Sequence, residues 1–158
     1  MADAGADRAY VAGLTLLARR ELAEAQLRAR LVKQKFAADE VDAAVERLRG
    51  ERALDDRRTA LACARTEVQL RRHGRMRVVR RVEALGIASD IAREAVAEVF
   101  TDLDEGELLE QALERRLRPG TGLDDPAAVR RLYRYLIGQG FEASAIARLL
   151  RRRGAQMT

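Results

Sequence analysis

A short apolar pattern occurs three times along the 158 residues of this chain. In each copy, two apolar residues stand nine and five positions before a larger apolar anchor, and a turn residue directly precedes that anchor. The copies are Leu27, Leu31 and Phe36; Val78, Val82 and Ile87; and Leu132, Leu136 and Phe141. The turn residues are Lys35, Gly86 and Gly140, and successive anchors lie 51 and 54 residues apart. This period indicates a repeated helical unit whose nine apolar residues serve as structural anchors.

The composition favours helices throughout, because the chain is rich in Ala, Leu, Glu and Arg and no segment alternates with a period of two. Three short helices bury little surface alone, so neighbouring units are expected to stack. The predicted fold is therefore all-α, with three tandem three-helix repeats forming an elongated, curved helical array. The repeats are expected at residues 8–54, 55–103 and 104–154, between disordered tails at 1–7 and 155–158.

Apolar periodicity and capping residues predict nine helices. Asp7, Ser89, Asp104 and Asp125 are the expected N-caps, with Glu107 completing a capping box and Pro126 in the first helical position. The segment 118–125 is expected to be a loop. The predicted helices are Arg8–Arg20, Ala23–Gln34, Asp39–Arg49, Asp55–Arg72, Arg75–Leu85, Ser89–Phe100, Glu105–Leu117, Pro126–Gly138 and Ala143–Arg153.

Several motifs stand in a fixed order along the chain. The first runs from Leu14 to Glu21 and on through 26–31; Leu54-Asp55-Asp56 follows, then Gly74 with basic residues as far as Gly86-Ile87. The last comprises 130–136 with Gly140-Phe141. Over about residues 10–153 the sequence resembles the RecX family of bacterial regulators of the RecA recombinase. It departs from the family pattern at Ala23, which replaces a capping serine, at Lys35, which replaces a turn glycine, and at 58–60, where an aromatic residue is usual.

The resemblance implies a non-enzymatic regulator that binds RecA and the RecA–DNA filament. It implies inhibition of ATP hydrolysis, strand exchange and co-protease activity, by occupying the filament groove or by blocking filament extension. A helical DNA-binding protein that acts directly on single- or double-stranded DNA is the alternative, because tandem three-helix units with a basic second helix resemble helix-turn-helix modules. A scaffold for other proteins is a third interpretation.

No catalytic residue, metal site or cofactor site is predicted. His73 and Cys63 are the single histidine and cysteine of the chain, so a cluster of these two residue types cannot form. His73 is expected to be an exposed residue at a helix end. The chain contains no phosphate-binding Gly-x-x-x-x-Gly-Lys-Ser/Thr loop. The acidic residues at 102–107 are expected to cap a helix rather than to bind a metal, and Cys63 to be a buried thiol.

Arginine rows are the candidate partner-binding surface, since guanidinium groups bind phosphates and carboxylates through paired donors. Net charge is +5. Arg77, Arg80 and Arg81 fall on one helical face, opposite the Val78 and Val82 seam, and are expected to be exposed. The full candidate set is Arg28, Arg30, Lys33, Arg75, Arg77, Arg80, Arg81, Arg130, Arg131, Arg134 and Tyr135. Solvated helix faces are the alternative interpretation of these rows, and core-edge packing is the alternative for Tyr133 and Tyr135.

The chain has neither the basic, apolar start of a signal peptide nor 18 consecutive apolar residues. It is therefore predicted to be a cytoplasmic monomer with no membrane contact.

Overall fold

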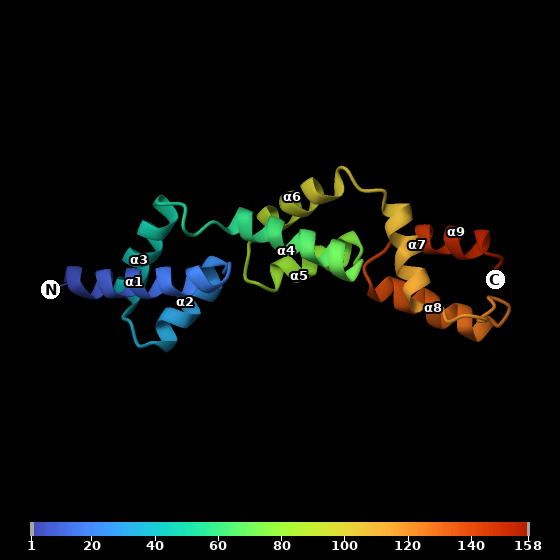
Figure 1. The fold of residues 1–158 in the computed structure, drawn as a ribbon, viewed down its shortest axis with the longest axis horizontal. Helices are drawn as coiled ribbons and strands as arrows, with labels where there is room; N and C mark the ends of the chain where they lie inside the picture. The colour runs from blue at the N-terminus through green and yellow to red at the C-terminus, as the bar shows by residue number, and fades with distance from the viewer. Residues whose placement is uncertain (1, 158) are drawn as a thin grey trace. The chain divides into compact units, whose positions relative to one another are not determined.

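The computed structural model of the chain describes residues 2–157. Within these residues the secondary structure consists of nine α-helices without a β-strand (Figure 1). The helices are α1 (Ala2–Arg19), α2 (Glu24–Lys33), α3 (Ala38–Gly50), α4 (Asp56–Arg71), α5 (Arg75–Glu83), α6 (Ser89–Phe100), α7 (Glu105–Arg116), α8 (Pro126–Gly138) and α9 (Ala143–Arg152). The all-α class and the three-helix repeats predicted from the sequence are confirmed. Helices α6 and α8 have the predicted bounds, and most of the other ends agree within one or two residues.

Helix α1 differs most from the prediction, because it begins at Ala2 rather than at Arg8. Residues 2–7 are therefore helical and not a disordered tail, and Asp7 lies inside the helix instead of capping it. Tertiary contacts hold this part of α1 against α3 and the residue that follows it. The Asp7 carboxylate lies 3.3 Å from the Arg47 guanidinium on α3, and the Tyr10 hydroxyl donates a hydrogen bond to Glu51 just beyond α3.

The first three helices pack around one apolar cluster, and α1 lies against α3. The approach is close at Gly13, where an added Cβ atom would lie 2.7 Å from a methyl carbon of Leu48. Phe36 is only partly buried at the edge of this cluster. The fully enclosed members of the cluster are Leu22, Leu27, Leu31, Val41, Val45, Leu48 and Leu54.

The chain forms two compact units. One comprises the residues up to Cys63 together with Val82–Ala95, and the other comprises Ala64–Arg81 together with the residues from Val96 onward. The second unit contains α7, α8 and α9, which contact one another around Leu113, Leu136, Ile146 and Leu150, all essentially inaccessible to solvent. Ala155 is also buried, and its backbone N–H donates to the carbonyl of Leu150, so the predicted disordered C-terminal tail is wrong at this residue.

The three turn residues of the repeated pattern share one backbone conformation. Lys35, Gly86 and Gly140 have φ values of 71°, 86° and 97°, in the left-handed region that ends many helices. In the first and third copies the anchor N–H closes the turn by donating to a core carbonyl, Phe36 to Leu31 and Phe141 to Leu136, both at 3.3 Å. The spacing of five between core residue and anchor is thus the spacing of a helix C-terminal hydrogen bond.

Two of these helix-ending turns pack against the first residues of another helix. A Cβ atom at Gly86 would lie 2.5 Å from Cβ of Ala25, near the start of α2. A Cβ atom at Gly140 would lie 2.4 Å from the backbone N of Arg77, near the start of α5. Glycine is needed at both positions, because any side chain would occupy the space of the docked helix. Lys35 is exposed and receives no such helix among the described residues.

Backbone hydrogen bonds reinforce the contact between α5 and the turn after α8. The N–H groups of Gly74 and Met76 donate to the carbonyls of Gln139 and Gly140, at 2.8 and 3.2 Å. The first amides of α5 are therefore satisfied by carbonyl groups that α8 leaves unpaired at its C-terminus.

Helix starts follow the sequence in some places and tertiary contacts in others. Asp125 and Asp104 are N-caps as predicted. Ser89 is instead the first residue of α6, and its side chain forms no hydrogen bond within the described residues. The carboxylate of Asp56, the first residue of α4, accepts a hydrogen bond from the backbone N–H of Glu24, the first residue of α2, at 2.7 Å. This contact supplies the acceptor that Ala23 lacks, so the weak N-cap predicted for α2 is compensated by a residue of another helix.

Candidate partner-binding surface

Helix α5 holds the densest row of predicted binding residues, but the structure gives these arginines different environments. The Arg75 guanidinium lies 2.6 Å from Glu105 and 5.1 Å from the centre of the Phe100 ring. Arg77 is half-buried, and its Nη1 donates to the carbonyl of Gly138 at the end of α8, at 3.0 Å. Both side chains therefore help to hold the second unit together, which corrects the prediction of an exposed face at Arg77.

Arg80 and Arg81 are both exposed. Arg81 Nε lies 3.6 Å from Glu67 Oε1, whereas no hydrogen bond or ion pair involves the Arg80 guanidinium within the described residues. Val78 and Val82 on the same helix are fully buried. Arg80 is thus the member of this row that is open to a partner.

Glu67 belongs to a buried polar cluster that the sequence did not reveal. Glu67 and His73 are 4% and 6% exposed, and His73 Nδ1 lies 2.6 Å from Glu67 Oε2. Burial lowers the pKa of His73; the Glu67 carboxylate acts against this shift, and the positive charge of Arg77 adds to it. His73 is therefore a buried hydrogen-bonded residue, not the exposed helix-end residue that its sequence context suggests.

The row on α2 is divided in the same way. Arg28 forms ion pairs with Glu24 at 2.9 Å and with Asp42 at 2.6 Å, and hydrogen bonds to Asp42 and then Glu24 raise its pKa. Arg30 is half-buried and Lys33 is exposed. Neither of the latter has a carboxylate partner in the described part of the chain.

The row on α8 is the least engaged. Arg130 and Arg134 are exposed and form no ion pair or hydrogen bond through their side chains within residues 2–157. Arg131 lies 3.8 Å from the capping carboxylate of Asp125. Tyr135 is half-buried, and the Arg116 guanidinium stacks on it at 5.1 Å from the ring centre. Tyr135 is therefore engaged within the molecule.

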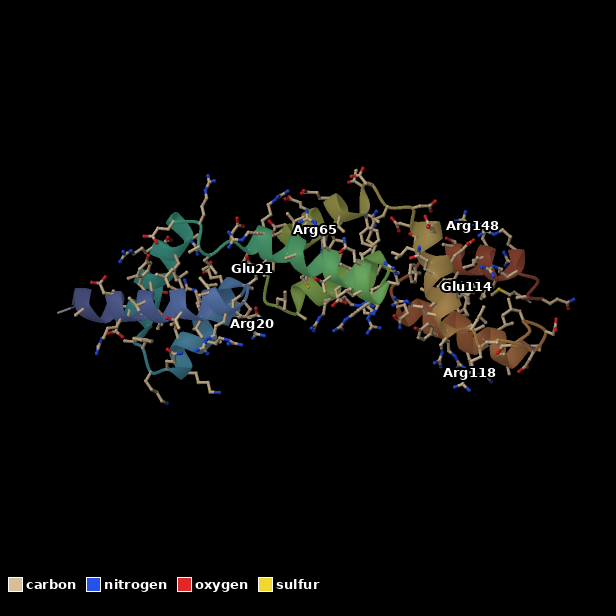
Figure 2. The ribbon with its side chains drawn as sticks, viewed as in Figure 1. Arg20, Glu21, Arg65, Glu114, Arg118 and Arg148 are labelled. Carbon is tan, nitrogen blue, oxygen red and sulfur yellow. The ribbon has the colours of Figure 1, made fainter. Side chains whose placement is uncertain are left out.

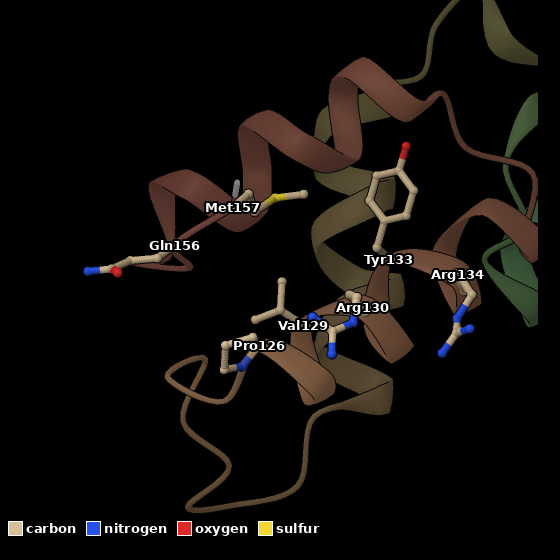
Figure 3. A pocket seen from close by; sticks show the side chains of 7 residues that line it. All are labelled: Pro126, Val129, Arg130, Tyr133, Arg134, Gln156 and Met157. Carbon is tan, nitrogen blue, oxygen red and sulfur yellow. The ribbon is translucent and has the colours of Figure 1, made fainter.

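Tyr133 instead borders a pocket of about 310 Å³ beside α8 (Figure 3). Of the residues that line this pocket, the candidate set predicted from the sequence contains Arg130 and Arg134; it names Tyr135 rather than Tyr133 and omits Pro126, Val129, Gln156 and Met157. The sequence pattern that could have indicated the α8 side of the pocket is the helical spacing of Val129, Arg130, Tyr133 and Arg134, which places them on one side of the helix. The contribution of Gln156 and Met157, from the segment after α9, could not be found without the fold.

Charged side chains also project from the rest of the surface (Figure 2). Glu114 pairs with Arg153 at 2.7 Å, while Arg148 is exposed on α9. No group of three or more His, Cys, Asp or Glu side chains in the described residues could hold a metal ion. Among these same residues, no helix combines the length and apolar character needed to cross a membrane.

Comparisons with known proteins identify the family. Residues 9–48 match the family model described as "RecX, first three-helix domain", and residues 104–150 match "RecX, third three-helix domain". The chain belongs to the RecX family. The RecX resemblance of the sequence motifs is thereby confirmed.

Relatives named "Regulatory protein RecX" align over most of their length. The chain is 32% identical over 140 residues to the one from Syntrophotalea carbinolica, covering 87% of this chain and 90% of the relative. It is also 32% identical over 147 residues to the one from Trichlorobacter lovleyi, covering 89% and 92%. These names support a regulatory role.

Solved RecX structures share the fold. A crystal structure of RecX from Lactobacillus salivarius has a TM-score of 0.83 at 19% identity, covering 97% of this chain and 98% of that one. Another crystal structure of regulatory protein RecX has a TM-score of 0.80 at 18% identity, covering 96% and 73%.

Proposed function

We propose that this protein is a non-enzymatic regulator that binds the RecA–DNA filament as a single chain and inhibits RecA. The inhibited activities would be ATP hydrolysis, strand exchange and co-protease activity. Inhibition would act through occupation of the filament groove or through a block at the growing end. Membership of the RecX family is the observation that carries the proposal.

The surface supports a partner that presents phosphates or carboxylates. Arg130 and Arg134 on α8, Arg80 on α5 and Lys33 on α2 are exposed and have no carboxylate partner within the described residues. Unpaired guanidinium groups gain more from a new anion than those already paired, because no existing contact is lost. A partner contact is therefore expected on α2, α8 and Arg80, whereas Arg75, Arg77 and Arg28 support it by fixing the helices.

The decisive experiment measures ATP hydrolysis by the RecA of the same organism on single-stranded DNA while this protein is added. The proposal expects inhibition at a small fraction of the RecA concentration, because one bound molecule affects a whole filament. Inhibition that begins only when the protein saturates free DNA would favour direct DNA binding. Unchanged hydrolysis at a molar excess over RecA would refute the regulator.

Charge reversal tests the surface separately. Arg130→Glu with Arg134→Glu, and Arg80→Glu alone, should raise the concentration needed for half-inhibition at least about fivefold, since loss of a charge-assisted hydrogen bond is typically worth 1.5–3 kcal/mol. The matched control is Arg148→Glu with Arg151→Glu on α9, both exposed and without an ion pair within the part of the chain that the structure describes. Equal loss of potency in the control would show that total charge, and not this surface, is responsible.

A further inference from the structure

The pocket beside α8 combines an apolar interior with two unpaired cations. Pro126 and Val129 come from the first turn of α8 and Met157 from the segment after α9, while Arg130 and Arg134 stand at its border. Tyr133 and Gln156 complete the lining (Figure 3). Its volume of about 310 Å³ lies at the lower end of the range of small-ligand sites, so it suits one large side chain.

The two guanidinium groups lie one helical turn apart, which places their Cβ atoms about 5–6 Å from each other. Their neighbour Arg131 faces Asp125, the N-cap of α8. The cationic part of the pocket border is therefore short and consists of two side chains. It matches one or two carboxylates, each of which a guanidinium can bind through two parallel hydrogen bonds.

From this juxtaposition we propose that the pocket binds an acidic peptide segment of a partner protein, with one large aliphatic side chain of the segment inserted between Val129 and Met157. Carboxylates flanking that side chain pair with Arg130 and Arg134, and the Gln156 amide is placed to hydrogen-bond the peptide backbone. Methionine suits such a wall because its flexible thioether adapts to the inserted side chain. The inference deepens the proposed regulatory function by naming the chemistry of the contacted segment, and so rests on it.

The lining favours a peptide over nucleic acid. Base binding relies on open aromatic faces and on a cationic groove that follows several phosphates. Here Pro126, Val129 and Met157 form the apolar walls, the one ring is half-buried, and two unpaired cations border the pocket. The apolar walls favour burial of an aliphatic side chain, a group that a peptide carries and nucleic acid does not.

The test is fluorescence anisotropy with the full chain and a labelled peptide in which a single leucine stands between pairs of glutamates. Specific binding is expected to weaken at least about tenfold, equivalent to 1.4 kcal/mol, in three cases. These are the protein variant Arg130→Glu with Arg134→Glu, a peptide with serine in place of leucine, and a peptide with glutamine in place of glutamate. Met157→Ser should weaken binding of the leucine peptide but not of the serine peptide.

The α9 variant Arg148→Glu with Arg151→Glu is the control of equal charge, and its affinity for the peptide should stay within about twofold of the wild type. Thermal melting by circular dichroism checks that each variant is folded. Equal affinity for the leucine and serine peptides would overturn the apolar pocket. Competition by single-stranded oligothymidylate, with the same dependence on Arg130 and Arg134 and no peptide binding, would assign the site to nucleic acid.

The RecA assay separates the two levels of the proposal. If the wild type inhibits RecA at substoichiometric concentration but does not bind the peptide, the pocket inference fails and the regulatory function stands. If the wild type binds the peptide specifically but leaves RecA hydrolysis unchanged, the pocket stands and the RecA partner is wrong.

Discussion

The absence of a side chain at Gly140 allows α5 to pack against the turn after α8. At Gly140 the backbone has φ 97° and the Arg77 nitrogen lies within 2.4 Å of a hypothetical Cβ. At Gly154 the backbone has nearly the same φ, 95°, and a Cβ atom would meet nothing within 4 Å. A substitution at Gly154 therefore measures the energetic cost of the left-handed backbone alone, whereas a substitution at Gly140 adds the cost of the close approach of α5.

Gly154→Ala should lower the free energy of unfolding by about 1–2 kcal/mol, the cost of a left-handed conformation. Gly140→Ala should lower it by roughly a further 1–3 kcal/mol, as in other overpacked sites. Urea denaturation followed by circular dichroism measures both. Equal losses in the two variants would show that the docking of α5 does not depend on space at Gly140.

His73 makes stability depend on pH near neutrality. Its pKa is lowered chiefly by burial, so the unfolded chain binds the proton more tightly than the folded chain. Stability should thus be complete above about pH 6.5, the ordinary histidine value, and fall as the pH decreases through it toward the folded-state pKa.

The urea midpoint should accordingly be lower at about pH 6 than at about pH 7.5. Because His73 is the sole histidine of the chain, His73→Gln should remove this difference, whatever its effect on absolute stability. A variant that retains the full difference would assign the pH dependence to another group.

At the scale of single elements, helix interiors were predictable and some helix starts were not. Apolar spacing located all nine helices, and Asp125 with Pro126 fixed the start of α8, because these signals are local. Asp7 and Tyr10 in α1 contact Arg47 and Glu51, which lie about forty residues away, and the first amide of α2 donates to Asp56. No local pattern contains such contacts.

One aspartate, Asp125, and one serine, Ser89, test which predicted N-caps contribute to stability. Asp125→Ala should lower the free energy of unfolding by about 1 kcal/mol, because the carboxylate accepts from the N–H groups of Ala127 and Ala128. Ser89→Ala should change it by less than about 0.5 kcal/mol, although sequence alone gives Ser89 the same role. Thermal or urea unfolding compares the variants, and a loss of 1 kcal/mol at Ser89 would restore it as a cap.

The sequence predicted which residue types form the candidate site, but not which of these side chains are free to contact a partner. Helical spacing correctly grouped arginines on α2, α5 and α8, yet it could not tell which of them have carboxylates or carbonyl groups nearby. Arg77 and Arg75 serve the fold through Gly138 and Glu105, groups that are distant in sequence. Arg130 and Arg134, by contrast, are exposed and form no ion pair or hydrogen bond through their side chains within the described residues.

At the scale of the whole molecule, the contact proposed for the exposed arginines should make binding to an anionic partner depend on salt. Raising ionic strength shortens the Debye length from about 10 Å at 0.1 M to about 3 Å at 1 M. The concentration of this protein that half-inhibits RecA should therefore rise with salt. The Arg130→Glu, Arg134→Glu variant should show a shallower dependence, measured in the same hydrolysis assay, while the α9 control keeps the wild-type slope; parallel slopes for all three would place the electrostatic contact elsewhere.

The start of α8 differs from the start of α5 in the backbone N–H groups that it leaves free. The start of α5 donates Gly74 and Met76 amides to the turn of another repeat. At the start of α8, Pro126 has no N–H, the Asp125 carboxylate accepts from the N–H groups of Ala127 and Ala128, and the N–H of Val129 donates to the carbonyl of Asp125. These amides are therefore not available for the kind of backbone contact that α5 makes with the turn after α8, and replacing Asp125 and Pro126 would make them available.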